Sequence, residues 1–174
     1  MDRHLIFHGA LTPIAARNTQ ILMVGAFREG ATRVVLHICS GGGDVVAGVG
    51  LYNFIRSLPW RVDTHAFGPC DSIAATVFMA GAARTCLPIS AFVLHGATYS
   101  DGPKVGQRAP NTDLIGAPFR EILGWSDPQI DHYFGTEDRR LLPREALTLG
   151  IVTSVQQFAL PMDANAIVHV AMPA

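Results

Sequence analysis

The sequence contains a single lysine, Lys104, and has little charge of either sign. Charged residues make up 16% of the 174 residues, and the formal net charge is −1. A protein that binds nucleic acid by neutralising phosphates needs clustered basic side chains, and this sequence has no such cluster. We therefore expect no nucleic-acid partner.

Long apolar runs and targeting signals are also lacking. No stretch approaches the roughly 20 apolar residues that a helix needs to cross a bilayer, and the N-terminus does not have a signal-peptide pattern. Only three cysteines occur, Cys39, Cys70 and Cys86, and their spacing matches no metal motif. We expect reduced, mostly buried thiols, a cytoplasmic location without membrane contact, and neither a metal nor another cofactor.

Apolar residues are abundant, at 49% of the chain. This content predicts one domain with a substantial core, and further apolar surface that is buried between subunits. Apolar strand patterns alternate with helical periods, which indicates an α/β fold. The strands are expected at residues 5–7, 33–39, 61–67, 91–95 and 151–155, and the main helices at residues 13–28, 44–58, 72–82 and 143–150.

Two of these elements allow finer predictions. The helix at residues 13–28 is expected to bury an apolar face that includes Ile14 and Ile21. The strand at residues 33–39 is too continuously apolar to be half exposed, so it should lie in the centre of the sheet. His37 within that strand is expected to be packed or hydrogen-bonded rather than catalytic.

One stretch, residues 68–81, combines a turn, a lone serine and a run of small and apolar residues at helical spacing. The turn of Gly68 and Pro69 comes first, and Ser72 follows where the first helical turn begins. Backbone N–H groups there lack intrahelical partners, and the helix dipole favours negative charge. Ser72 is thus placed to act as a nucleophile, although serine and aspartate at such positions often serve only as N-caps.

Further patterns surround this serine in a definite order. A glycine loop at residues 41–43 separates a strand from a helix, and a later apolar strand ends in His95. An aspartate–arginine pair begins at Asp138 and precedes a Glu-Ala and a Gly-Ile-Val motif. In this order the chain resembles the Clp protease proteolytic subunit (caseinolytic protease) family over roughly residues 4–153. Each motif alone is weakly specific, but four in the right order are fairly specific.

The resemblance implies a single α/β domain in which β-β-α units form a spiral, the fold shared by Clp proteases and crotonases. Residues 1–155 would form the peptidase domain, and residues 156–174 a C-terminal extension of the same domain. The implied activity is that of a self-compartmentalising serine endopeptidase that acts on peptides or unfolded proteins. The implied assembly is a homo-oligomeric ring of six or seven subunits, single or stacked.

An AAA+ unfoldase is a weakly supported further partner. The resemblance starts at the family's first core strand, so the N-terminal helix and axial loop that precede this strand in the family have no counterpart in the sequence. This argues weakly against the usual docking of an unfoldase.

Residue by residue, the resemblance implies a triad. Ser72 would be the nucleophile, His95 the base that takes its proton, and Asp138 the group that orients the base. Glu137 and Asp101 are alternatives to Asp138, which itself is a candidate for a plain surface ion pair.

The same resemblance places the oxyanion donors at the backbone N–H groups of Gly43 and Ile73. Glycine suits the first position because the main chain must approach the substrate without an intervening Cβ. An extended substrate would add as a strand along residues 41–45. The implied substrate-binding positions in that segment are Gly41, Gly42, Asp44 and Val45.

The sequence departs from the family pattern in several places. Asp71 precedes the serine where the family has a small residue, and its carboxylate would repel an oxyanion unless it turns away or caps the helix. Ala74 replaces a glycine. The segment between His95 and Ser126 is short and contains Pro118, which we expect to begin only a short helix, so the family's long handle helix and its ring-to-ring contact are in doubt.

The C-terminal tail lies beyond the family pattern. Its strand pattern at residues 166–170 is a candidate for pairing across a subunit boundary.

Other interpretations stay open. A crotonase-like acyl-coenzyme A enzyme would share the fold and use a Glu or Asp acid/base with oxyanion N–H groups. A catalytically weak ring subunit would need no working triad. Cys70 beside His95 is a less favoured nucleophile, because a reactive cysteine needs a site that favours the thiolate. A Ser–Lys dyad would have to use Lys104.

Overall fold

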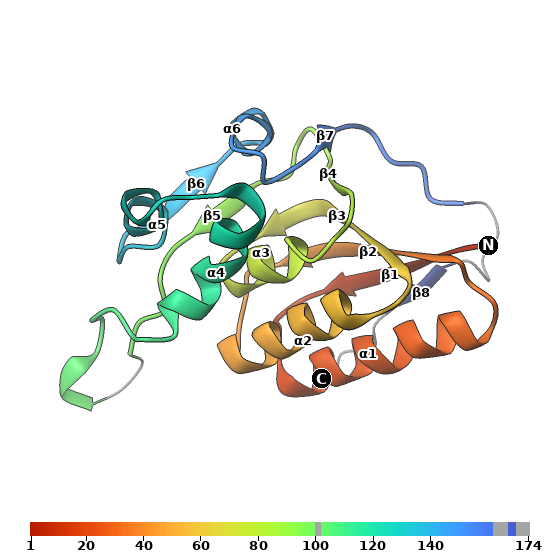
Figure 1. Ribbon diagram of the computed structural model, residues 1–174, viewed down its shortest axis with the longest axis horizontal. Coiled ribbons are helices and arrows are strands. Elements are labelled where there is room, and N and C mark those ends of the chain that lie inside the picture. Colours follow the sequence, from red (N-terminus) through yellow and green to blue (C-terminus); the bar gives the residue numbers. More distant parts are fainter. Residues whose placement is uncertain (100–101, 162–166, 170–174) are drawn as a thin grey trace.

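The computed structural model describes residues 1–99, 102–161 and 167–169, in which strands and helices alternate (Figure 1). The strands are β1 Asp2–His8, β2 Arg33–Ser40, β3 Arg61–Cys70, β4 Arg84–Cys86, β5 Phe92–Leu94, β6 Arg139–Leu141, β7 Ser154–Val155 and β8 Ile167–His169. The helices are α1 Pro13–Arg28, α2 Val45–Ser57, α3 Ile73–Phe78, α4 Thr112–Leu123, α5 Asp127–Tyr133 and α6 Pro143–Thr148, with a 3-10 turn η1 at Gly102–Lys104. The predicted α/β class is confirmed.

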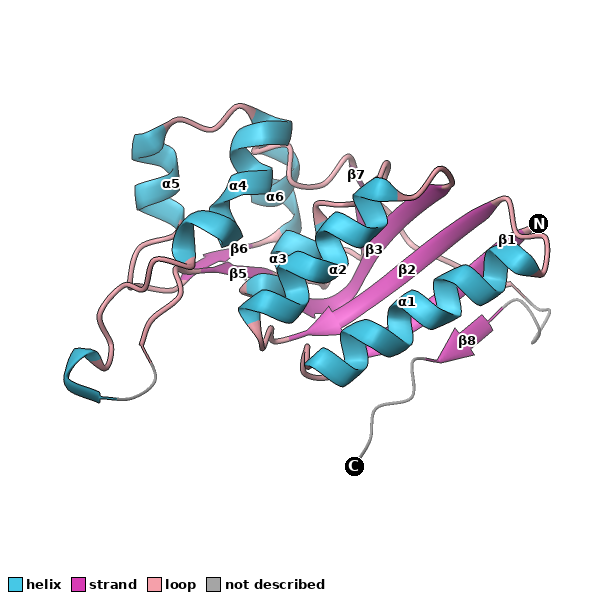
Figure 2. Cartoon of the chain, turned by 60° about the horizontal axis from the view of Figure 1, so that its bottom comes forward, coloured by secondary structure: helices cyan, strands magenta, loops and turns pink. Residues whose placement is uncertain are grey.

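Six strands form one parallel sheet in the order β7-β4-β3-β2-β1-β8, with β2 inside it as its apolar sequence predicted. Figure 2 shows α1, α2 and α3 on one face of this sheet. Because the strands are parallel, their carboxyl ends meet at one edge. The loops that follow β1, β2 and β3 therefore come together there, and these loops include the glycine loop and the serine turn.

The first helix begins where the sequence predicted. The Ala15 N–H donates to Thr12 Oγ1 at 3.1 Å, and Pro13 occupies the first turn. The predicted buried face is wrong in part, since Ile14 and Ile21 are 55% and 56% exposed. Smaller side chains face the sheet instead and let the helix approach it closely. The side chains buried on α1 are Ala15, Ala16, Thr19, Met23, Ala26 and Phe27.

The serine helix is shorter than predicted. It ends at Phe78 rather than at residue 82, and there the Phe78 carbonyl accepts a hydrogen bond from the Thr64 hydroxyl at 2.7 Å. β4, a strand of only three residues, follows and was not predicted.

The ladder of β5 and β6 and the helices α4 to α6 lie to one side of the parallel sheet (Figure 1). Pro118 lies inside α4, so the prediction of a short helix that begins at this proline is wrong. Gly116 lets α5 pack closely, because a Cβ there would lie 3.3 Å from Ile130 Cγ2. The loop that carries η1 projects from the body, and α4 has only 12 residues, so no long handle helix forms in the described part.

The face of the sheet opposite the helices carries three buried histidines, His4 on β1, His37 on β2 and His65 on β3, here called the histidine row. His4 Nδ1 lies 3.0 Å from His37 Nε2, and His65 Nδ1 lies 2.7 Å from Thr85 Oγ1. The Phe158 ring covers the row, with its centroid 4.8 Å from those of His37 and His65. A cavity of about 190 Å³ remains beside these rings. His37 is therefore packed in the sheet, as expected.

The tail contributes β8, which pairs in parallel with β1 of the same chain, with Ile167 opposite His4. The expected strand is present at residues 167–169 and pairs within the chain; residues 166 and 170 of the predicted strand lie outside the described residues. Within the part of the chain that the structure describes, no helix is long and apolar enough to cross a membrane.

Candidate active site

Ser72 has an unusual main-chain conformation. Its φ is 54° and its ψ is −131°, and no other non-glycine residue in the described ranges has a positive φ. Two bonds hold it there: the Ser72 N–H donates to the Val93 carbonyl at 2.7 Å, and its own carbonyl accepts from the Ala75 N–H. The Ser72 side chain makes no capping hydrogen bond. A strained serine at a strand-to-helix turn is the arrangement of a nucleophile elbow rather than that of an N-cap.

The glycine loop lies against this serine. A Cβ on Gly42, whose φ is +97°, would stand 2.8 Å from Ser72 Cβ, so only glycine fits. Glycine is needed at the neighbouring position 43 because of Leu11: a Cβ on Gly43 would lie 2.3 Å from the Leu11 carbonyl oxygen. Gly42 is thus the glycine that lies against the serine, and Gly43 the one that lies against Leu11.

Leu11 holds the glycine loop through its main chain. Its N–H donates to the Gly42 carbonyl at 2.8 Å, and its carbonyl accepts from the Asp44 N–H at 2.7 Å. Gly43 lies between these two bonds, so its own N–H and carbonyl point away from Leu11. The Asp44 side chain caps α2 by accepting from the Ala47 N–H at 2.7 Å.

The two predicted oxyanion donors are unpaired. Among the described residues, the N–H groups of Gly43 and Ile73 donate to no other group. Gly43 faces away from Leu11, and Ile73 is the first residue of α3, where a helix has free N–H groups. Each of these two N–H groups is therefore a candidate donor to a developing negative charge.

His95 follows β5 directly. The β5–β6 ladder ends where Leu94 pairs with Arg139, so His95 directly follows one strand and Asp138 directly precedes the other at this end of the ladder. The His95 Nδ1 lies 2.9 Å from the Gly96 carbonyl oxygen. A carbonyl can only accept, so Nδ1 carries the proton and Nε2 is left as the acceptor that a general base needs.

The predicted triad is brought into one region without being joined. Within the described residues no hydrogen bond links Ser72 to His95 or His95 to Asp138; the His95 ring bonds to a main-chain carbonyl instead. Catalytic hydrogen bonds are often long in the absence of substrate and tighten in the complex. Asp101, an alternative third member, lies outside the described residues.

The Asp71 carboxylate lies among the charged groups of the site. Burial raises the pKa of its carboxyl group, while the hydrogen bond from the Val93 N–H and the charges of Arg140 and His95 lower it, and Asp138 raises it again. The carboxylate accepts the Val93 N–H at 2.8 Å. Its side chain therefore neither caps α3 nor takes up the N–H groups of the predicted oxyanion site, which answers the question that the sequence left open.

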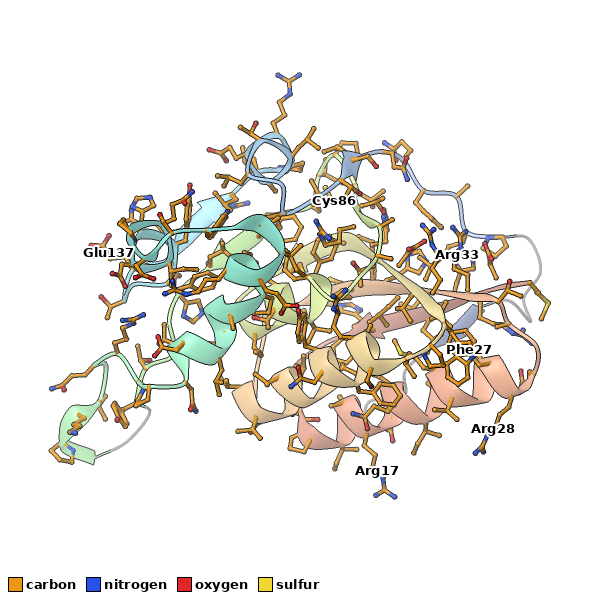
Figure 3. All side chains as sticks on the ribbon, in the orientation of Figure 1. Arg17, Phe27, Arg28, Arg33, Cys86 and Glu137 are labelled. Carbon is orange, nitrogen blue, oxygen red and sulfur yellow. The ribbon has the colours of Figure 1, made fainter. Side chains whose placement is uncertain are left out.

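The alternative site residues lie in other surroundings. Glu137 pairs with Arg139 at 3.0 Å and lies at the left edge of the view, beside α5 (Figure 3). Lys104 lies on the projecting loop, with its ammonium 5.7 Å from the centre of the Tyr99 ring. Complete burial raises the pKa of the Cys70 thiol well above its ordinary value, so this group is not a thiolate nucleophile.

Sequence reasoning missed Leu11 and Val93, which hold the glycine loop and the serine turn. Both act through main-chain groups, which leave no mark in the choice of side chain. The described residues contain no group of three or more His, Cys, Asp or Glu side chains that would hold a metal ion.

Comparisons with known proteins identify the family of this chain. Residues 3–108, more than half of the chain, match the family model described as Clp protease. ATP-dependent Clp protease proteolytic subunit 3 of Streptomyces coelicolor is 26% identical over 171 residues, which span 90% of this chain and 77% of that protein. ATP-dependent Clp protease proteolytic subunit 1 of Streptomyces avermitilis is 35% identical over 148 residues, which span 78% of this chain and 66% of that protein.

A solved structure matches the fold. The structure of the ClpP1 N165D mutant from Listeria monocytogenes matches 90% of this chain and 92% of its own, with a TM-score of 0.79 and 21% identity. The fold implied by the sequence motifs is therefore confirmed.

Proposed function

Because this chain belongs to the Clp protease family, we propose that it is a serine-type endopeptidase that hydrolyses peptides or unfolded proteins. The observation that carries the proposal is the strained main chain of Ser72, together with the N–H groups of Gly43 and Ile73, which have no acceptor among the described residues. A positive φ in a non-glycine residue costs free energy, and such strain is kept where a site uses it.

In this mechanism His95 takes the hydroxyl proton of Ser72 on Nε2 while the Ser72 oxygen attacks the peptide carbonyl carbon. The N–H groups of Gly43 and Ile73 bind the resulting oxyanion. His95 then gives the proton to the leaving amine, and the C–N bond breaks to leave an acyl-enzyme. A water deprotonated by His95 releases the acid and restores the serine.

Asp138 would assist His95 through its charge. It directly precedes β6 at the end of the ladder where His95 follows β5, and a carboxylate near the base would stabilise the imidazolium that forms in the transition state. The Gly96 carbonyl already fixes the tautomer, so the carboxylate is not needed for that purpose.

The substrate would bind as an extended strand beside the glycine loop. Leu11 occupies one edge of this segment, while the N–H and carbonyl of Gly43 on the other edge bond to no described group. An extended peptide satisfies such an edge by main-chain hydrogen bonds. Gly41, Gly42, Asp44 and Val45 would line this strand.

A fluorophosphonate probe on the intact protein tests the assignment. We expect covalent labelling of Ser72, loss of labelling and of peptide cleavage in Ser72→Ala, and unchanged labelling in the control Ser57→Ala. Ser57 is an exposed hydroxyl at the end of α2 that bonds only to the Phe54 carbonyl. Tight coenzyme A binding without labelling would indicate a crotonase-like enzyme, and neither result would indicate a structural ring subunit. Cleavage that persists in repurified Ser72→Ala would refute the nucleophile.

We further propose a closed homo-oligomeric ring of six or seven subunits. Ile14 and Ile21 on α1 and Val46 on α2, which is 71% exposed, offer apolar surface that a ring would bury. The short α4 and the projecting loop favour weak or rearranged pairing between rings. The names of both Streptomyces relatives describe subunits of an ATP-dependent protease, so an ATP-using unfoldase is a proposed partner.

Sedimentation or native mass measurement tests the assembly. A stable monomer at micromolar concentration would refute the ring, and a robust double ring would show that the short α4 suffices.

A further inference from the structure

The turn that carries the nucleophile and the strand that leads to the base are joined by a reciprocal pair of hydrogen bonds. The Ser72 N–H donates to the Val93 carbonyl at 2.7 Å, and the Val93 N–H donates to Asp71 Oδ1 at 2.8 Å. Val93 is the middle residue of β5, and His95 follows two positions later. The position of His95 relative to Ser72 therefore depends on how β5 is held along this edge.

Asp71 binds β5 on the edge that faces the serine turn, because the opposite edge pairs with β6. On its opposite side β5 pairs with β6, with Val93 across from Arg140. On the edge that faces the serine turn, the main-chain bonds are those from the Cys70 N–H to Ala91 and from the Ser72 N–H to Val93. The Val93 N–H on this edge is bound by a side chain, the Asp71 carboxylate, instead of by a main-chain carbonyl.

Two hydrogen bonds hold the main chain of Asp71, so its side chain links β5 to a fixed part of the site. Its N–H donates to the Ser40 carbonyl at 2.9 Å, and its carbonyl accepts from the Ala74 N–H at 3.0 Å. One bond ties it to the end of β2, directly before the glycine loop, and the other to the first turn of α3. The carboxylate then links these elements to β5 over the short reach of an aspartate side chain.

Charge strengthens this link. A hydrogen bond to an ionised carboxylate is shorter and stronger than one between neutral groups. Burial raises the pKa of Asp71, as does the charge of Asp138, whereas the Val93 N–H, Arg140 on β6 and His95 favour its charged form. The neighbouring titratable thiols of Cys39 and Cys70 are neutral, because burial, and secondarily the Asp71 charge, raises their pKa values.

We propose that Asp71 is a positioning residue of the peptidase site, which holds the strand leading to His95 against the turn that carries Ser72. The proposal rests on the proposed function and deepens it. It also reverses the first expectation for this residue. A carboxylate that repelled the oxyanion would slow the reaction, whereas a carboxylate that positions His95 relative to Ser72 speeds it. A shift of a catalytic group by about 1 Å typically costs on the order of 100-fold in rate.

The test compares Asp71→Ala with Asp71→Asn. Alanine removes the acceptor, so we expect kcat to fall by about 100-fold, with KM changed far less, and the Val93 amide to exchange faster with solvent. Asparagine keeps an oxygen at the same place, so it should restore the protection of Val93 and most of kcat. Glu145→Ala is the matched control: it removes a carboxylate that accepts a main-chain N–H, that of Leu142 at 2.7 Å, from another part of the molecule. The control should keep kcat.

Two results would overturn the proposal. One is wild-type or higher kcat in Asp71→Ala, and the other is lost protection of Val93 with unchanged kcat, which would make the bond merely structural. If Asp71→Ala does not fold, Asp71→Ser takes its place with the same expectations. Failure of the proposed function would appear separately, as a wild-type protein that is not labelled at Ser72; amide exchange at Val93 then decides alone whether Asp71 holds β5.

Discussion

His95 and the histidine row show the same side chain in two surroundings. His95 is partly exposed after a three-residue strand, with Nδ1 bound to the Gly96 carbonyl and Nε2 open. His37 is 3% exposed, and its ring packs against His4, His65 and Phe158. In the proposed mechanism His95 exchanges a proton with the bound substrate, while His37 serves as a packing group.

Electrostatics separate the two settings further. Burial lowers the pKa of His37 to about 3, with smaller contributions from the charges of His65 and His4, and burial lowers the pKa of His65 to about 4. These groups are neutral at pH 7 and are poor proton acceptors there. Position at a strand therefore does not decide whether a histidine is catalytic; solvent access and polar partners do.

The largest expected effect is that of replacing His95, the histidine of the proposed active site. His95→Ala should lower kcat at least about 10³-fold, because the general base is lost. The free energy of unfolding should change by less than about 1 kcal/mol, since only one main-chain hydrogen bond goes with the ring. Peptidase kinetics and denaturant titration measure the two quantities. Near-normal turnover in this variant would remove His95 from the mechanism.

The reverse outcome is expected on the other face of the sheet. His37→Ala should lower the free energy of unfolding by about 2–4 kcal/mol, because it leaves a void beside Phe158 and takes away the partner of His4. At temperatures well below unfolding, kcat should stay within about twofold. His132→Ala, at an exposed histidine on α5, is the matched control and should change stability by less than about 0.5 kcal/mol. Equal effects in the two variants would contradict the packing role.

Acid should lower the free energy of unfolding through the buried histidines of the row. The pKa values of His37 and His65 are lower in the folded chain than the ordinary 6.5, so the folded state resists protonation. Their contribution to stability is complete above pH 6.5 and is lost as the pH falls toward 4 and then 3. We expect the free energy of unfolding to drop by about 2 kcal/mol between pH 6.5 and 4.5 from each group.

The control for this pH effect is His65→Gln, which keeps a polar partner for Thr85 but does not titrate. Its loss of stability with acid should be smaller than that of the wild type. A wild-type curve that is flat between pH 6.5 and 4.5 would contradict the buried neutral state of the row.

The elements that sequence predicted well are those fixed by local chemistry. Thr12 and Pro13 mark the start of α1 by capping and by a preset φ, and the apolar run of β2 placed it inside the sheet. The errors arise where tertiary contacts decide. α4 continues through Pro118 because packing against α5 outweighs one lost hydrogen bond, and Ile14 is exposed because small residues on the other face of α1 meet the sheet.

For the site, sequence motifs identified the residues but not their directions. Ser72 and the glycine loop meet because β2 and β3 are parallel and their carboxyl ends lie at one edge, whereas β5, which leads to His95, belongs to a separate ladder and is joined to the serine turn through Val93. The Asp71 side chain turns to Val93, a partner more than 20 residues away that acts through its main chain. Nothing in the residue types of that strand encodes this bond, so the role of Asp71 could not be predicted from sequence.

The smallest expected effect concerns the third member of the proposed triad, Asp138. In a serine peptidase this carboxylate fixes the tautomer of the base and stabilises its charged form. Here the Gly96 carbonyl already accepts the Nδ1 proton of His95, so Asp138 would contribute chiefly its charge from an exposed position. Asp138→Ala should therefore lower kcat only about tenfold, which is the effect of roughly 1.4 kcal/mol in the transition state.

Glu137→Ala is the matched control for this variant, because it removes a neighbouring carboxylate that pairs with Arg139, and it should leave kcat unchanged. Raising the salt concentration should weaken the contribution of Asp138, since an exposed charge is screened. A fall of 10³-fold or more in Asp138→Ala would mean that the substrate-bound enzyme breaks the bond to Gly96 and hands the Nδ1 proton to the carboxylate. The ability of His95 to act as a base would then depend on Asp138. The difference between His95 and the histidine row would in that case come from the charge of Asp138, and not from solvent access and the bond to the Gly96 carbonyl.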